Sequence, residues 1–113
     1  MGRLICSDDT LAVAGNTTSA ELIPQDRIAA PESGTLVLLA TVSATGVNAR
    51  LVVGGDVVCD NEQVHLGVGV GTYVSYPTDM QVSTKIRKGA VLSLMFDNVT
   101  GGSLNVSYKL YIL

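Results

Sequence analysis

Side chains of the types that bind metals gather around the only histidine of the chain. Cys59, Asp60, Asn61, Glu62 and His65 fall within seven residues. Asp-Asn-Glu between two apolar stretches is, however, typical turn composition. On a strand, this spacing gives only one of the required ligand types a suitable position. We therefore expect no metal site, and we expect His65 to be a surface or strand-edge histidine.

No catalytic or cofactor motif accompanies these residues. The stretch "GVGVGTY" (67–73) has the Gly-x-Gly-x-Gly spacing of a phosphate-binding loop but lacks its lysine and the helix that follows it. A hydrolytic triad would need a serine or cysteine motif to act with His65, and the sequence contains none. Ten carboxylates offer pairs for glycoside cleavage, yet aromatic residues, which sugar subsites use as platforms, are only 4%. The sequence predicts a protein that is not an enzyme and uses no cofactor.

The balance of charge argues against a nucleic-acid partner. The 113-residue chain has seven Lys and Arg against ten Asp and Glu, a formal net charge of −3. A protein that binds phosphate backbones needs a basic face. The one basic cluster, Lys85, Arg87 and Lys88, flanks a predicted turn at Gly89 and is typical of a solvated hairpin tip.

The sequence also lacks the patterns typical of a membrane-spanning helix and of a secretory signal. No stretch approaches the ~20 apolar residues of a membrane-spanning helix, and "MGRLICSDDT" does not resemble a secretory signal. These features predict a soluble protein without a membrane partner. Cys6 and Cys59 have no metal-ligand spacing and are either two free thiols or one disulfide. Asn-x-Ser/Thr triplets begin at Asn16, Asn98 and Asn105, and we attribute them to chance.

Most of the chain alternates between apolar and polar side chains with a period of two, which is typical of β-strands. The clearest stretches are 35–44, 48–55, 79–89, 90–98 and 103–113. Residues 1–34 are less regular, and Pro24 and Pro31 would remove donors from a ladder, so we expect an N-terminal arm with edge strands. The sequence predicts one all-β domain over residues 1–113, an antiparallel, jelly-roll-like sandwich of two sheets and about eight strands.

Residues 64–76 pose a separate question, because Gly67, Gly69 and Gly71 occupy alternate positions beside an unbroken apolar row. A strand of thirteen residues would be roughly twice the usual length. We expect it to bend or split near Gly71, with the glycines supplying curvature or a bulge. Two alternatives stay open, since a bare face also admits a neighbouring subunit or a flat ligand such as a sugar.

Several strands carry apolar residues on both faces, which a single sandwich of this size would leave partly exposed. Charged residues, at 15% against a typical value of about 25%, do little to interrupt such surface. We therefore expect these side chains to be buried against other copies of the chain. The candidate interface residues are Val37, Leu39, Gly67, Gly69, Val91, Met95, Tyr111 and Leu113.

Two stretches also carry a resemblance to a known group of proteins. "IAAPESGTLVLLATVSA" (28–44) leads through Pro and Gly into a long strand, and "VSTKIRKGAVLSLMFDNVTGGSLNVSYKLYIL" (82–113) alternates three strands with Lys-Gly and Gly-Gly turns. Together they resemble, in pattern, the small single jelly-roll structural proteins of viruses, including phage capsid and capsid-decoration proteins. Trimeric jelly rolls of the tumour-necrosis-factor and complement-head type share this pattern of strands and turns at the C-terminal end.

The resemblance implies a non-enzymatic shell or spike component of a virion that self-associates, often as a homotrimer, and contacts other capsid proteins. The short acidic N-terminal segment differs from the basic arm of genome-packaging capsid proteins, which favours an outer, decorating position. The alternative is a carbohydrate- or ligand-binding β-sandwich module, in which Tyr73 and Tyr111 would be the outward aromatic residues. The absence of tryptophan favours the structural protein.

Overall fold

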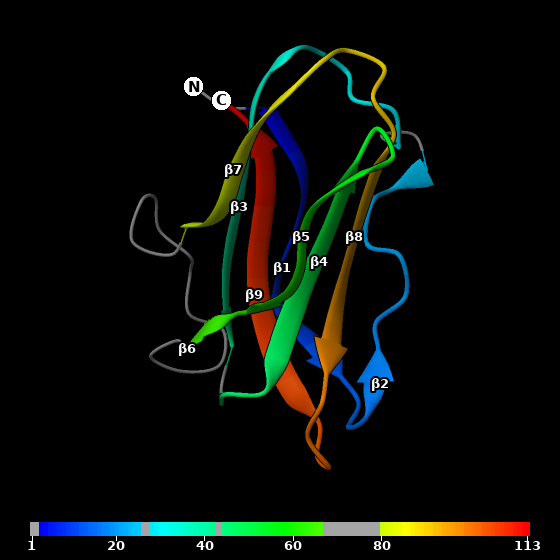
Figure 1. The fold of residues 1–113 in the computed structure, drawn as a ribbon. Coiled ribbons are helices and arrows are strands. Elements are labelled where there is room, and N and C mark those ends of the chain that lie inside the picture. Colours follow the sequence, from blue (N-terminus) through cyan, green and yellow to red (C-terminus); the bar gives the residue numbers. More distant parts are fainter. Residues whose placement is uncertain (1–2, 26–27, 43, 67–79) are drawn as a thin grey trace.

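Nine strands run through the part of the chain that the computed structural model describes, which comprises residues 3–25, 28–42, 44–66 and 80–113 (Figure 1). In chain order they are β1 (Arg3–Val13), β2 (Thr17–Thr18), β3 (Gly34–Val42), β4 (Val47–Val53), β5 (Asp56–Gln63), β6 (His65–Leu66), β7 (Met80–Ile86), β8 (Leu92–Asn98) and β9 (Leu104–Ile112). None of the described residues builds a helix that is long and apolar enough to cross a membrane.

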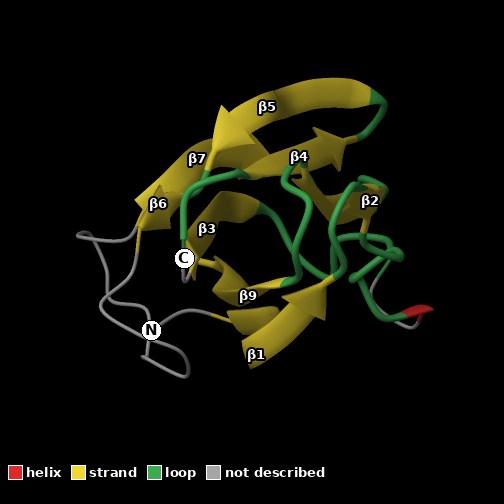
Figure 2. Cartoon of the chain, turned by 90° about the horizontal axis from the view of Figure 1, so that it is seen from below, coloured by secondary structure: helices red, strands yellow, loops and turns green. Residues whose placement is uncertain are grey.

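The strands form two sheets that pack face to face. Sheet A has the order β1-β9-β3-β6, with β7 also paired to β3, and sheet B has the order β2-β8-β4-β5. Figure 2 shows β1, β9 and β3 in one layer and β2, β4 and β5 in the other. The predicted all-β sandwich of two antiparallel sheets is therefore confirmed.

The pairing of the strands is nested. β1 pairs with β9, β2 with β8, β3 with β7, and β4 with β5, all antiparallel. The first strand thus lies beside the last and the middle strands beside each other, which is the jelly-roll order. The two-residue β6 is an addition to this plan and runs parallel to β3.

The inner face of sheet B follows directly from sequence alternation. Along β8, Leu92, Leu94 and Phe96 are buried, and the residues between them are half-exposed. β4 repeats the pattern in register, so that Leu51 lies opposite Leu94 and Ala49 opposite Phe96. Because successive side chains of a strand point to opposite faces, this alternation commits one face to the core.

The two sheets meet through an aromatic pair. The rings of Phe96 in β8 and Tyr108 in β9 have centroids 5.4 Å apart and planes tilted by 50°, a favourable geometry for aromatic packing. Burial raises the pKa of the Tyr108 hydroxyl above its ordinary value, and the nearby Cys6 and Asp8 raise it further. Tyr108 is therefore neutral in the folded protein throughout the physiological range.

β3 departs from the one-sided pattern because it is buried on both faces. Its inward residues Leu36 and Leu38 belong to the core between the sheets. Its outward residues Val37 and Leu39 are only 1% and 3% exposed in the single chain, and Thr41 on the same face is also buried. The expectation that one copy would expose Val37 and Leu39 is therefore wrong. The folded chain itself covers this part of the outer face of sheet A.

The N-terminal strands lie at sheet edges. β1 is an 11-residue strand that pairs with β9 and contains both of the apolar pieces "LIC" and "LAV". Its register shifts between Leu4 and Cys6 and again between Asp8 and Leu11, which accommodates the irregular sequence. The two-residue β2 forms the edge of sheet B next to β8.

Asn98 at the end of β8 ties three parts of the fold together. Its side chain is fully buried, and its Nδ2 donates to the carbonyl oxygens of Val13 (2.9 Å) and Gly102 (2.8 Å). Its Oδ1 accepts hydrogen bonds from the backbone N–H (2.9 Å) and hydroxyl (2.7 Å) of Thr100. All four hydrogen-bonding positions of the amide are thus used to join β1 to the β8–β9 connection. A buried, fully bonded amide of this kind is unsuited to accept a glycan.

Candidate subunit interface

The structure describes six of the eight predicted interface residues, and these fall into three pairs. Val91 and Met95 lie on the outer face of sheet B, whereas Tyr111 and Leu113 lie on the outer face of sheet A at the opposite side of the sandwich. Val37 and Leu39 are buried within the chain. Gly67 and Gly69, and with them the expected bend near Gly71, lie outside the described residues, as does Tyr73.

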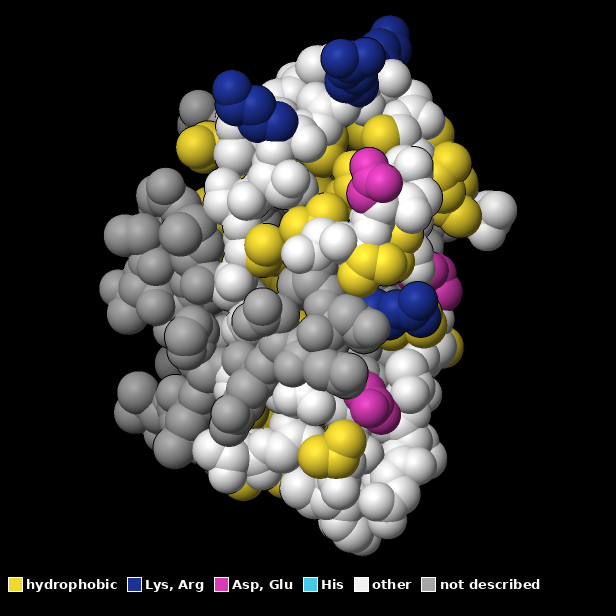
Figure 3. Space-filling model, in the orientation of Figure 1, with side chains coloured by type: hydrophobic (Ala, Val, Ile, Leu, Met, Phe, Trp, Pro, Cys, Tyr) yellow, Lys and Arg dark blue, Asp and Glu magenta, His cyan; other side chains and the backbone are white. Residues whose placement is uncertain are grey.

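An apolar strip crosses the outer face of sheet B. It consists of Val52, Val57, Val91 and Met95, and we call it the valine surface. Val57 and Val91 are 54% and 57% exposed, and Val52 and Met95 are half-exposed. Figure 3 shows hydrophobic side chains over β4 and β5 on this face, between scattered charged ones.

The valine surface is assembled by strand register. Val52 of β4 lies opposite Val57 of β5 on one side and Ser93 of β8 on the other. The hairpin between β4 and β5 turns at Gly54 and Gly55, whose φ angles of 57° and 88° are in the left-handed region that glycine tolerates. Gly54 N–H donates to the carbonyl oxygen of Val91 at 2.8 Å, which draws the start of β8 to this turn.

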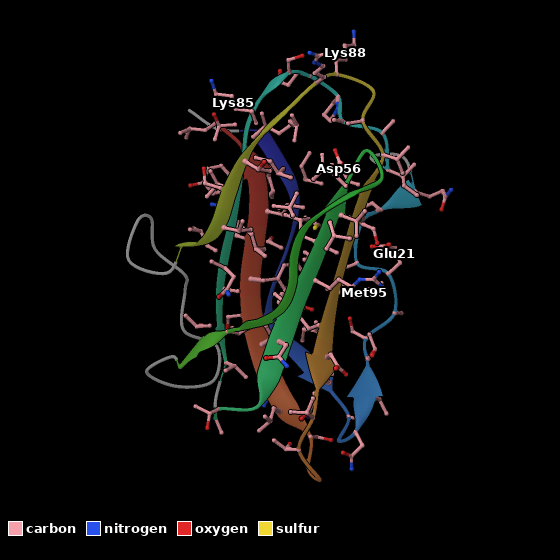
Figure 4. All side chains as sticks on the ribbon, in the orientation of Figure 1. Glu21, Asp56, Lys85, Lys88 and Met95 are labelled. Carbon is pink, nitrogen blue, oxygen red and sulfur yellow. The ribbon has the colours of Figure 1, made fainter. Side chains whose placement is uncertain are left out.

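Glu21 fixes the rim of the valine surface. Its Oε1 accepts a hydrogen bond from the hydroxyl of Ser93 at 2.5 Å, and its Oε2 accepts one from the Leu94 N–H at 2.8 Å. Figure 4 shows Glu21 on the same side of the molecule as Met95, which follows Leu94 in β8. Beyond the end of β2, no neighbouring strand carbonyl in the described part of the chain accepts a hydrogen bond from the Leu94 N–H on this edge of β8. The Glu21 carboxylate accepts it instead, so this edge is hydrogen-bonded by a side chain.

A second exposed apolar surface lies at one end of sheet A. It consists of Leu4, Tyr111 and Leu113, and we call it the C-terminal surface. Leu4 of β1 lies opposite Tyr111 of β9, and Leu4 and Leu113 are 44% and 58% exposed. The Lys109 ammonium lies 5.8 Å from the centre of the Tyr111 ring, where it can make a cation–π contact.

Leu4, Val52 and Val57 are members of these surfaces that were not among the predicted interface residues. In "RLIC" a strict period of two would place Leu4 and Cys6 on the same face, but the register shift after Leu4 turns both Ile5 and Cys6 toward the core. Val57 follows a two-glycine turn and a charged residue, so its face could be assigned only once the turn geometry was known. A local irregularity hid the signal at Leu4 and at Val57, whereas β4 alternates regularly and its pattern already places Val52 outward.

The residues around His65 do not form the turn that the sequence indicated. Residues 60–62, expected in a turn, belong to β5 and pair with β4, with Glu62 opposite Ala49 and Gln63 opposite Asn48. Register shifts on either side of Leu51 absorb the polar insertion without ending the strand. Across the part of the chain that the structure describes, no three His, Cys, Asp or Glu side chains converge as they would to hold a metal ion.

No family model, curated protein or solved structure matches the chain. A function for this chain is therefore inferred from the geometry of its described residues.

Proposed function

We propose that this chain is a non-enzymatic structural protein of a virus, a capsid or capsid-decoration component that assembles from copies of itself. The observation that carries the proposal is the pair of exposed apolar surfaces on opposite faces of a jelly roll. A monomer gains nothing from half-exposed valines and leucines in these positions, whereas burying them against another copy is favourable by about 25 cal/mol for each Å² removed from water.

The position of the two surfaces favours a head-to-tail contact. Because the valine surface and the C-terminal surface lie on opposite faces and differ in residues, the simplest assembly places one against the other on the next copy. Repeating such a heterologous contact closes a ring when the rotation between copies allows it. We propose a homotrimer, the order common among the viral jelly rolls that the sequence resembles, located in the virion and in contact with other capsid proteins.

Sedimentation velocity at micromolar concentration tests self-association. The unaltered chain is expected to sediment as a small multiple of 11.7 kDa, and Val91→Asp or Met95→Lys is expected to dissociate it while leaving its thermal transition intact. Val99→Asp is the matched control, because Val99 is an equally exposed valine (58%) that lies outside both surfaces. A single species of 11.7 kDa that persists on concentrating would contradict the proposal.

The viral assignment has its own test. Quantitative mass spectrometry of purified particles from the source should find the protein at a copy number that is a simple multiple of the particle's other shell proteins. Its absence from purified particles would refute a place in the virion while leaving self-association to be judged by sedimentation.

A further inference from the structure

A groove of about 500 Å³ opens at the end of the sandwich where β3 begins and β7 ends. The described residues that line it are Gly34, Thr35, Lys85, Ile86 and Arg87. Thr35 and Lys85 face each other across the paired strands, and Gly34 faces Ile86. The groove thus has two cations, a hydroxyl-bearing side chain and the buried Ile86 along its walls. Its volume falls in the range typical of small-molecule sites, roughly 300–1,000 Å³.

The positive charge at this end of the molecule is concentrated on neighbouring residues. Lys85, Arg87 and Lys88 are three of the seven Lys and Arg residues of an otherwise acidic chain, and all three are exposed. Among the described residues none of the three forms an ion pair. Figure 3 shows Lys and Arg side chains gathered at this end, and Figure 4 shows Lys85 and Lys88 there.

The backbone that carries these cations is anchored. Lys88 N–H donates to the hydroxyl of Ser33 at 2.9 Å, and Gly89 N–H donates to the Ala30 carbonyl at 2.8 Å. Ala30 in turn donates its N–H to the Ala90 carbonyl at 2.7 Å. Cations on a fixed turn lose less freedom when they bind an anion than cations on a loose loop.

We propose that this groove binds a short sugar that carries sulfate or phosphate groups. The planar guanidinium of Arg87, which directly follows β7, can bind such a group through two hydrogen bonds, and Lys85 lies two residues earlier, about 7 Å away for extended backbone. Two anionic groups on one or two sugar rings match this separation. The groove is larger than a single oxyanion requires, which leaves space for the ring itself beside Thr35 and Ile86.

A nucleic acid fits this site less well. The cations are confined to one end of a chain with net charge −3, so a long polyanion would leave the basic cluster and meet acidic surface. Single strands are usually held by aromatic side chains on which bases stack, and the described lining of the groove contains none. The chemistry therefore favours a compact anionic ligand.

A simpler role for the same cations is protection of a sheet edge, since lysines on an edge strand discourage pairing with other chains. That role needs positive charge anywhere along β7. It requires neither a groove nor selectivity for anions, and it predicts no ligand binding. The two roles therefore differ in a measurable outcome.

Isothermal titration calorimetry with a heparin-type sulfated disaccharide tests the proposal, with the unsulfated disaccharide and inorganic phosphate as comparison ligands. We expect the sulfated disaccharide to bind more tightly than either, with affinity that falls as salt is added. Arg87→Gln and Lys85→Gln should each weaken binding at least about tenfold, the loss expected for a charge-assisted hydrogen bond. Arg50→Gln on the outer face of sheet B, which removes the same charge elsewhere, should change it less than about twofold.

Several results would overturn the proposal. These are no measurable binding of the sulfated disaccharide, equal binding of its unsulfated counterpart, or an equal loss with Arg50→Gln. Equally tight binding of a single-stranded DNA of the same charge would overturn the assignment to a sugar. Aggregation of the Lys85→Gln, Arg87→Gln double variant, with no binding by the unaltered chain, would assign the cations to edge protection. Thermal transitions matching the unaltered chain establish that the variants are folded.

Discussion

The outer faces of the two sheets both carry apolar side chains, but the two faces differ in how far the chain buries them. On sheet A, the centre of the outer face is buried within the chain at Val37, Leu39 and Ser107, and the large apolar side chains that the structure describes as exposed there lie at the end formed by the C-terminal surface. On sheet B, the outer face stays open along β4 and β8, and its half-exposed valines and Met95 lie among charged groups. Similar apolar patterns in the sequence therefore lead to burial within the chain in one place and to an exposed surface in the other.

This difference decides what a substitution does. An outward apolar residue in the centre of sheet A contributes to the free energy of folding, because its side chain is already buried in a single chain. An outward apolar residue of the valine surface, on the proposed assembly, contributes to association, because it leaves water only when another copy covers it. The proposal therefore predicts that stability and oligomeric state respond to different residues, and substitutions on the two faces test that separation.

Removing β9 should have the largest effect. β9 lies between β1 and β3 in sheet A and buries Val106, Leu110 and Ile112, each worth roughly 1.5–3 kcal/mol. Deleting residues 104–113 also leaves two ladders without a partner, so the loss is comparable to the whole stability of a typical domain, about 5–15 kcal/mol. We expect no cooperative thermal transition by circular dichroism. A cooperative transition in this truncated chain would show that sheet A does not depend on β9; deletion of Leu113 alone is the control.

Leu39→Ala tests the buried centre of sheet A directly. Because Leu39 is 3% exposed, its truncation should lower the free energy of unfolding by about 2–5 kcal/mol, measured by urea denaturation. Val57→Ala, on the valine surface, should change it by less than about 0.5 kcal/mol at concentrations where the chain is monomeric. If both variants lost the same stability, the distinction between the two faces would fail.

Asn98→Ala should cost about 1–3 kcal/mol, because it leaves the carbonyl oxygens of Val13 and Gly102 without the donor that they share. Asn48→Ala, a half-exposed amide on the outer face of sheet B, should cost less than about 0.5 kcal/mol. Differential scanning calorimetry on both variants measures the contrast. An equally small effect at both positions would mean that the β1 connection is held by the strand pairs alone.

Alkaline pH should weaken the contact between the sheets by a smaller amount. The pKa of Tyr108 is higher in the folded state than its ordinary value of about 10. Above pH ~10 the unfolded chain therefore releases this proton while the folded chain retains it, and stability falls as pH rises, by at most about 1.4 kcal/mol per pH unit. Tyr108→Phe should remove that slope in urea titrations between about pH 9 and 11. An unchanged slope would show that Tyr108 ionises freely in the fold.

The main lines of the fold were predictable because β4 and β8 alternate in the ordinary way, with one face for the core and one for solvent, and β9 does the same over residues 108–112. The structure differs from the sequence-based expectation where the strands are irregular. The register shift after Leu4 places Ile5 and Cys6 both inward, and the polar residues 60–62 continue β5 where their composition suggested a turn.

Among the interface residues, sequence reasoning could find apolar side chains on an outward face but could not say what covers them. Val91 and Leu113 are exposed as expected, whereas Val37 and Leu39 carry the same signal and are buried. Coverage of a sheet face depends on how distant segments fold over it. Alternation within one strand holds no information about that, so the distinction between the two outer faces required the tertiary structure.

A mixing experiment tests the head-to-tail contact most directly. Leu113→Asp places a charge in the C-terminal surface and leaves the valine surface unchanged. Val91→Asp places a charge in the valine surface and leaves the C-terminal surface unchanged. Each variant alone should sediment at 11.7 kDa, and an equimolar mixture should form a heterodimer of twice that mass that grows no further, because only one productive pair of surfaces remains. A mixture that stays at 11.7 kDa, or either variant alone retaining the assembly of the unaltered chain, would contradict the pairing of these two surfaces.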